Sequence, residues 1–192
     1  MTPTVCILTH CPDLTYLYGT LLTVQTVRIG FPTARVIVCD NASLPEAQIQ
    51  IRQAAEAAGA RVLQLTPRFS LPLPHWDVLR GLVLTARLPF IHPPIRQGPL
   101  VILDGDILFW ENCESWQFDG LLAGRLIPAG VRGMGEETVI CLPRLHTSFL
   151  WIPDRRTLRQ RIEDIQTTHL SWDPFTPWTI PDPFRSRVWY LG

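Results

Sequence analysis

Short apolar runs recur along the first half of the chain and are separated by longer segments of mixed polarity. The runs lie at Thr4–Thr9, Arg35–Cys39, Arg61–Leu65 and Leu100–Leu103. Such runs are typical of strands that are buried on both faces. The pattern therefore predicts four buried strands, which we expect to lie in one sheet.

The segments between these runs carry apolar residues at helical spacing. A first helix is predicted from Leu14 until Gly30 and Pro32 stop it. A second helix is predicted to open with a capping box formed by Ser43 and Glu46 and to close at Gly59. A third is expected over His75–Ala86. Strands that alternate with helices in this way predict an α/β fold with a parallel, doubly wound sheet.

The pattern changes after Asp106. Apolar segments at Leu121–Ile127 and Leu145–Ile152 are separated by a glycine-rich stretch over residues 130–137, which is expected to be a mobile loop. Asp154 is expected to cap an arginine-rich helix that runs through Gln166. The 192 residues are enough for one well-buried domain, so we expect a single domain over 1–192.

Composition excludes several classes of function. Acidic and basic residues balance at 17 each, so nucleic acid is not an expected partner. No apolar run approaches the length of a membrane span, and the first residues do not have the pattern of a signal peptide. The five cysteines are scattered, which favours buried thiols over a disulfide framework. We therefore expect a cytoplasmic protein.

Every basic residue is arginine, and the chain contains no lysine. This excludes a Walker A loop, whose lysine contacts phosphate, and a pyridoxal phosphate enzyme, which requires a lysine Schiff base. Any phosphate must therefore be met by arginine, a metal ion or backbone N–H groups.

Two acids, Asp104 and Asp106, follow the fourth apolar run directly, with Gly105 between them. Ligands of open α/β sheets bind at this end of the strands, and side chains two apart on a strand point the same way. A glycine between them lets a ligand approach the backbone. Paired carboxylates suit Mg²⁺ or Mn²⁺, which in turn suits a diphosphate. The alternative is a polar strand end that only caps the next element.

Over Val5 to Ile152 the chain resembles the GT-A glycosyltransferases, whose signature is a D-x-D after a hydrophobic strand. The resemblance also rests on the opening strand Val5–His10 and on the turn Asp40–Ser43 after the second strand. It implies a Rossmann-like three-layer sandwich with a mostly parallel sheet. Residues 1–110 would form the nucleotide-binding half and 111–192 the donor and acceptor half. It further implies transfer of a sugar from a nucleoside diphosphate sugar to an acceptor hydroxyl, with Mn²⁺ or Mg²⁺.

The resemblance also assigns roles to individual residues. Asp104 and Asp106 match the acids that hold the metal ion and take part in catalysis, and Asp104 also reaches the ribose. His146 and Ser148 match the strand that lines the donor sugar and the acceptor. The expected nucleotide-binding residues are Thr9, His10, Asp40, Arg80 and Asp104.

The second half departs from the family pattern, because it is short and irregular. His169 is a candidate third metal ligand, and Asp173 or Asp182 a candidate catalytic base, of which Asp173 is preferred. The chain stops at Gly192, so a truncated, catalytically incomplete relative that binds only a nucleotide or a partner protein stays open as the alternative. The acceptor, whether carbohydrate, lipid-linked or protein, is not predicted.

Two other enzyme classes also fit parts of the pattern. Haloacid dehalogenase-like phosphatases have a D-x-D after an apolar strand, but they use a lysine and place the motif on the first strand. Sugar-nucleotide pyrophosphorylases share the sheet, but their glycine-rich loop after the first strand is replaced here by Thr9–Asp13. Both classes rank below glycosyl transfer.

Overall fold

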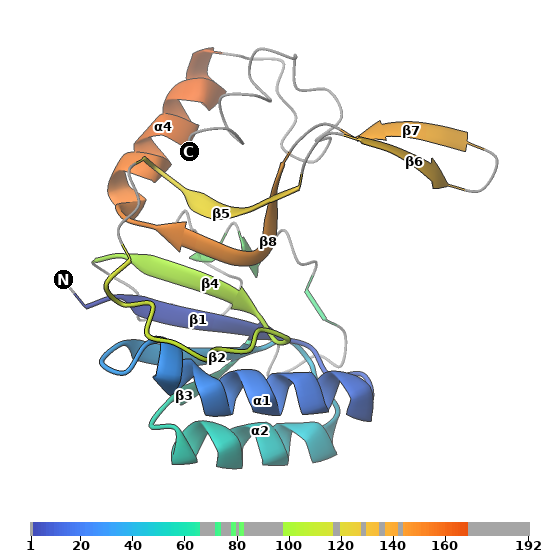
Figure 1. Cartoon of the computed structure of the whole chain (residues 1–192), viewed down its shortest axis with the longest axis vertical. Helices are drawn as coiled ribbons and strands as arrows, with labels where there is room; N and C mark the ends of the chain where they lie inside the picture. The colour runs from blue at the N-terminus through green and yellow to red at the C-terminus, as the bar shows by residue number, and fades with distance from the viewer. Residues whose placement is uncertain are drawn as a thin grey trace.

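A mixed β-sheet lies at the centre of the structure, a computed structural model (Figure 1). The model describes residues 2–65, 72–73, 78–79, 81–82, 98–116, 120–127, 130–134, 137–141 and 144–168, with side chains described outside 125–147 and 162–168. Six of the described strands form this sheet in the order β3-β2-β1-β4-β8-β5. Their bounds are β1 Thr4–Thr9, β2 Arg35–Asp40, β3 Arg61–Gln64, β4 Leu100–Asp104, β5 Ala123–Ile127 and β8 Arg144–Ile152.

The first four strands are parallel, and β8 runs antiparallel to both β4 and β5. Each of these four begins at the residue predicted from its apolar run. The expectation of an α/β fold with a mostly parallel sheet is therefore confirmed. Because these four strands share one direction, their carboxyl ends lie along one edge of the sheet.

Helices cover both faces of the sheet. On one face, α1 (Leu14–Gly30) and α2 (Pro45–Ala57) pack against a cluster that includes Val5 and Ile7 of β1. The alternate residues of β1, Cys6 and Leu8, face a second cluster that includes Leu82 and Leu158 of α4 (Arg155–Thr168). Figure 1 shows α1 and α2 on one side of the sheet and α4 on the other. The expected three-layer arrangement is confirmed.

The cysteines with described side chains are buried free thiols, as expected: Cys6, Cys11, Cys39 and Cys113. A hydrogen bond with Cys39, together with complete burial, raises the pKa of the Cys6 thiol well above its ordinary value. Cys6 therefore remains protonated and packs as a small apolar side chain.

The start of α2 differs from the prediction. Ser43 does not cap the helix, because the N-cap is Leu44 and Pro45 is the first helical residue. The Ser43 hydroxyl instead accepts a hydrogen bond from the Cys11 backbone N–H at 2.8 Å. The predicted capping box is therefore wrong, and Ser43 joins the loop after β2 to the loop after β1. The end of α2 is as predicted, since Gly59 follows it with a φ of +61°.

The glycine-rich stretch expected to be a loop contains two strands. β6 (Gly130–Met134) and β7 (Glu137–Cys141) pair antiparallel as a separate two-stranded sheet, which extends away from the central sheet in Figure 1. Its glycines lie at β6 positions 130 and 133, which the sequence rules read as breakers. The prediction of a loop over 130–137 is therefore wrong.

Two helices are covered unequally. Of the helix expected over His75–Ala86, the described residues 78–79 and 81–82 are helical, and the others lie outside the described residues. The cap of α4 is confirmed, because the Asp154 carboxylate accepts hydrogen bonds from the backbone N–H groups of Arg156 and Thr157. Within the part of the chain that the structure describes, no helix has the length and apolar character needed to cross a bilayer.

Candidate functional site

The two acids of the D-x-D motif lie at the carboxyl edge of the sheet, but they do not lie on one strand. β4 ends at Asp104, and Gly105 and Asp106 form a turn. The strand rule that side chains two apart point the same way therefore does not apply to Asp106. Asp104 is partly buried and Asp106 is exposed. The turn thus presents one carboxylate at the strand end and one to solvent.

Gly105 is required by packing inside the protein. A Cβ atom at this position would lie 2.7 Å from the hydroxyl oxygen of Thr20 and 3.3 Å from the carbonyl oxygen of Leu8. On the opposing helix, a Cβ at Gly19 would lie 3.3 Å from the Gly105 carbonyl oxygen. The D-x-D turn therefore rests directly on α1. The expectation that this glycine admits a ligand is replaced by a close approach of helix and turn.

A buried group of three side chains lies beneath the turn. The Thr9 hydroxyl is 2.9 Å from the Thr20 hydroxyl and 3.3 Å from the Cys11 sulfur, and the same sulfur is 3.4 Å from the Thr20 hydroxyl. Thr9 is only 5% exposed and Thr20 only 2% exposed. The hydroxyl of Thr9, an expected nucleotide-binding residue, thus points into the protein in this structure, where it links β1 to α1.

The segment after the turn continues along α1. The Ile107 backbone N–H donates to the Thr23 hydroxyl at 2.9 Å, and the Phe109 N–H donates to the Thr26 hydroxyl at 3.3 Å. With Thr20, these threonines recur every three residues on one side of α1. Sequence reasoning missed this role. The signal available was a series of polar residues at helical spacing on the face that was predicted to be buried.

Asp40 lies at the same edge, at the end of β2 and opposite Thr9 in the parallel register. Its side chain is completely buried. One carboxylate oxygen accepts a hydrogen bond from the Ser43 N–H at 3.3 Å, and the other has no hydrogen-bond partner among the described residues. A buried carboxylate oxygen of this kind is costly, so its presence favours a functional or positioning role over simple packing.

The loop after β2 is tied to the loops on either side of it. The Asn41 side chain both donates to the Leu73 carbonyl and accepts from the Leu73 N–H, each at 2.8 Å. The exposed His10 ring lies 2.8 Å from the Asn41 carbonyl oxygen. These contacts hold three loops together at the carboxyl edge, which is the place where α/β folds bind ligands.

β8 brings Ser148 to this edge. The antiparallel register pairs Leu103 with Phe149, so Ser148 is the next residue towards Asp104, and it is 8% exposed. β8 is also irregular here on its other side. Gly124 of β5 pairs with Leu150 and Arg125 with His146, so one step along β5 opposes four along β8. Such bulges often lie beside active sites, where they redirect side chains.

Several expected site residues are placed only in part. His146 lies on β8, and its side chain is outside the described set. Arg80, His169, Asp173 and Asp182 lie outside the described residues altogether. Of the expected set, the structure therefore brings together Thr9, His10, Asp40, Asp104, Asp106 and Ser148.

The acids of the turn have the chemistry that a divalent cation needs. Within the described residues, no group of three or more His, Cys, Asp or Glu side chains could enclose a metal ion. Mg²⁺ and chemically similar ions are, however, commonly held by one or two carboxylates together with substrate phosphates and water. Asp104 and Asp106 offer two such oxygen donors on a fixed turn, so the donor set fits a cation that is shared with a phosphate-bearing ligand.

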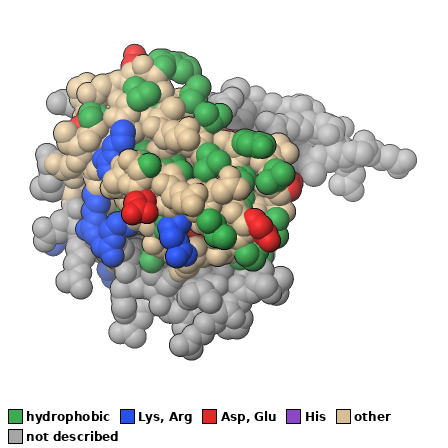
Figure 2. Space-filling view, turned by 90° about the horizontal axis from the view of Figure 1, so that it is seen from below, with side chains coloured by type: hydrophobic (Ala, Val, Ile, Leu, Met, Phe, Trp, Pro, Cys, Tyr) green, Lys and Arg blue, Asp and Glu red, His purple; other side chains and the backbone are tan. Residues whose placement is uncertain are grey.

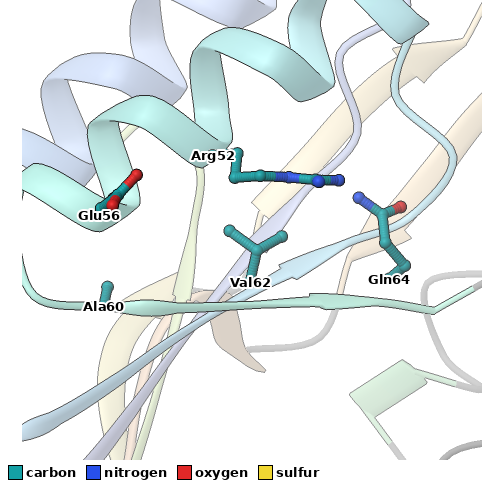
Figure 3. A pocket seen from close by; sticks show the side chains of 5 residues that line it. All are labelled: Arg52, Glu56, Ala60, Val62 and Gln64. Carbon is teal, nitrogen blue, oxygen red and sulfur yellow. The ribbon is translucent and has the colours of Figure 1, made fainter.

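A hollow of about 450 Å³ lies elsewhere, between α2 and the edge strand β3 (Figure 3). None of the expected site residues lines it. Figure 3 shows Arg52 of α2 extending over Val62 towards Gln64. The residues that line it are Arg52, Glu56, Ala60, Val62 and Gln64.

No protein-family model and no curated protein matches the sequence. Among solved structures with a similar fold, the apo form of the glycosyltransferase GlyE of Streptococcus pneumoniae TIGR4 is 13% identical, with a TM-score of 0.49. That match covers 97% of this chain and 42% of GlyE. The galactosyltransferase LgtC, crystallised with donor and acceptor sugar analogues, is 14% identical, with a TM-score of 0.48, over 86% of this chain and 63% of LgtC. Both are glycosyltransferases. A likeness at this level concerns only the general course of the chain, which spans less than two thirds of either protein.

Proposed function

We propose that this chain is a GT-A glycosyltransferase that transfers a sugar from a nucleoside diphosphate sugar to an acceptor hydroxyl with the help of Mn²⁺ or Mg²⁺. The observation that carries the proposal is the D-x-D turn at the carboxyl edge of the sheet. There it lies beside the ends of β1 and β2, with Asp104 opposite Leu8 and Asp40 opposite Thr9 in the parallel registers. This is the edge at which open α/β sheets bind nucleotides.

In this proposal Asp104 and Asp106 hold the cation, which when bound would neutralise the charge on the departing nucleoside diphosphate. The contacts of Gly105 and Asp106 with α1 fix the turn, so the two carboxylates are positioned before any ligand arrives. No lysine is available for the phosphates. The cation therefore carries more of the charge neutralisation than it would beside a basic side chain.

The remaining residues of the edge would bind and orient the donor. Asp40 is completely buried, so we assign it the role of holding the loop Asn41–Ser43 and not of contacting the base. His10 is exposed at the same loop and is available to the nucleotide. Ser148, which follows next in register beside Asp104, would lie towards the sugar.

Turnover tests the proposal directly. The protein is incubated with a panel of UDP- and GDP-sugars in the presence of Mn²⁺, and release of free UDP or GDP is followed by chromatography. Slow donor hydrolysis that stops on addition of EDTA supports the proposal. Binding of a nucleotide sugar without release would support a catalytically incomplete relative instead, and neither binding nor release for any donor would contradict both.

A further inference from the structure

The outward face of α1 is apolar along the whole helix. Leu14, Tyr18, Leu22 and Ile29 lie along it and expose between 48% and 64% of their surface. Figure 2 shows hydrophobic side chains spread widely over the side of the molecule that α1 and α2 form. A surface helix ordinarily presents charged and polar residues to water. An extended apolar face of this kind is typical of an interaction surface.

Charge is absent from this face. The only charged residue of α1 is Arg28, and its guanidinium group is directed to the end of α2. There it donates hydrogen bonds to the carbonyl oxygens of Ala58 at 2.7 Å and Gly59 at 3.0 Å. The one polar residue on the outward face is Gln25, which is exposed and neutral. A surface without charge excludes an acidic or basic partner as its natural complement.

The segment after the D-x-D turn enlarges this apolar face. It is held against α1 by the bonds from Ile107 to Thr23 and from Phe109 to Thr26. Two side chains of this segment, Leu108 at 53% and Trp110 at 80%, are exposed. Exposed Trp and Tyr side chains are enriched in the cores of protein interfaces.

The outward face of α1 has the same spacing when it is read from either end. Its positions are separated by steps of four, three, one, three and four residues, so the pattern is symmetric about the point between residues 21 and 22. The positions are Leu14, Tyr18, Leu21, Leu22, Gln25 and Ile29. A surface that is symmetric about its midpoint is self-complementary under a two-fold axis.

We propose that α1 packs antiparallel against α1 of a second copy of this chain, across a two-fold axis between Leu21 and Leu22. In that arrangement each position faces its symmetric counterpart. Tyr18 faces Gln25 of the second copy, so the only two polar groups of the interface are matched as hydrogen-bond partners. Leu14 faces the second copy's Ile29, and no charged side chain is buried.

The exposed area is sufficient for such a dimer. With about 150–250 Å² for each large aromatic side chain and somewhat less for each aliphatic one, the six exposed residues offer on the order of 700 Å² per chain. An interface of ordinary size buries about 800 Å² per partner. The six are Leu14, Tyr18, Leu22, Ile29, Leu108 and Trp110.

The first test compares the oligomeric state of the full chain with that of two variants by analytical ultracentrifugation over a concentration series. The native protein is expected to dimerise. Leu22→Glu, which sets like charges close to one another at the axis, should raise the dissociation constant by about 100-fold or more. Tyr16→Glu is the matched control, because Tyr16 is 60% exposed on the same helix but lies outside the symmetric pattern, and it should leave the dissociation constant unchanged.

A second test reads the geometry. The double variant Tyr18→Cys with Gln25→Cys should form a disulfide-linked dimer under mild oxidation, whereas each single variant should not, because equal positions lie far apart in the antiparallel pair. A native protein that stays monomeric, or a Leu22→Glu protein that dimerises as well as the native one, would overturn the proposal. Cross-linking by either single variant would overturn the antiparallel arrangement.

Discussion

Gly105, the central residue of the D-x-D motif, lies against Thr20 of α1 so closely that a Cβ atom would stand 2.7 Å from the threonine hydroxyl oxygen. This contact connects the position of the two acids to the packing of the first helix. The geometry of the site thus depends on a residue that carries none of its chemistry.

Substitution of Gly105 by Ala should therefore destabilise the protein by about 1–3 kcal/mol, the ordinary cost of overpacking a close contact. The added Thr20→Ala change removes the obstructing hydroxyl and should recover part of this loss. Urea unfolding of both single variants and the double variant measures the coupling. Strictly additive effects would show that the two residues are not in contact in solution.

Thr23 should matter for the same segment through its hydroxyl. Thr23→Val removes the acceptor of the Ile107 N–H while it keeps the shape of the side chain, so we expect a loss of about 1–3 kcal/mol. Thr23→Ser keeps the acceptor and serves as the control. Equal stabilities of the Val and Ser variants in denaturant melts would contradict the hydrogen bond.

The strands were predictable because burial on both faces leaves a continuous apolar run. All four parallel strands begin where the sequence places them, at Thr4, Arg35, Arg61 and Leu100. The edge to which the acids belong follows from the same rule. The turn after Asp104 was not predictable, because it is set by a contact with α1 that is distant in sequence. Ser43 shows the same limit, since its hydroxyl pairs with Cys11 and not with its own helix.

Glu114 should contribute to stability from far along the chain. Its carboxylate accepts hydrogen bonds from the Thr33 N–H at 2.6 Å, the Thr33 hydroxyl at 2.9 Å and the Ala34 N–H at 2.8 Å. Glu114→Ala should cost about 2 kcal/mol, since bonds to a charged acceptor are stronger than neutral ones. Glu111→Ala, an exposed acid on the same segment, should change stability by no more than about 0.5 kcal/mol. Thermal melts that rank the two variants equally would contradict this account.

Asp154 should make the stability of the α4 end depend on pH. The Thr157 hydroxyl, with the N–H groups of Arg156 and Thr157, lowers the pKa of this carboxyl below its ordinary value of 3.8. The stabilisation is therefore complete above pH 3.8 and is lost as the pH falls through the lowered value. Asp154→Ala should cost about 1 kcal/mol at neutral pH.

The matched control is Asp154→Asn, which keeps a capping side chain but does not titrate. The difference in unfolding free energy between the native protein and this variant should shrink in acid. A difference that is constant from neutral pH down to the acid limit would contradict the cap.

The fate of the glycine-rich stretch illustrates what local rules miss. Gly130 and Gly133 lower the strand propensity of β6, yet each pairs with a residue of β7 in the antiparallel register. The pairing residues were apolar or β-branched, such as Val139 and Ile140, and they carried the strand signal. A reading that gave the partner strand the same weight as the glycines would have found the hairpin.

Isothermal titration of the nucleoside diphosphates UDP and GDP into the protein, with and without Mn²⁺, tests the central claim most directly. The claim predicts binding that requires Mn²⁺ in the native protein and in Glu111→Gln, an exposed acid away from the sheet edge, and that is abolished in folded Asp106→Asn. Unchanged Mn²⁺-dependent binding by folded Asp106→Asn would contradict the assignment of a cation and a diphosphate to the D-x-D turn.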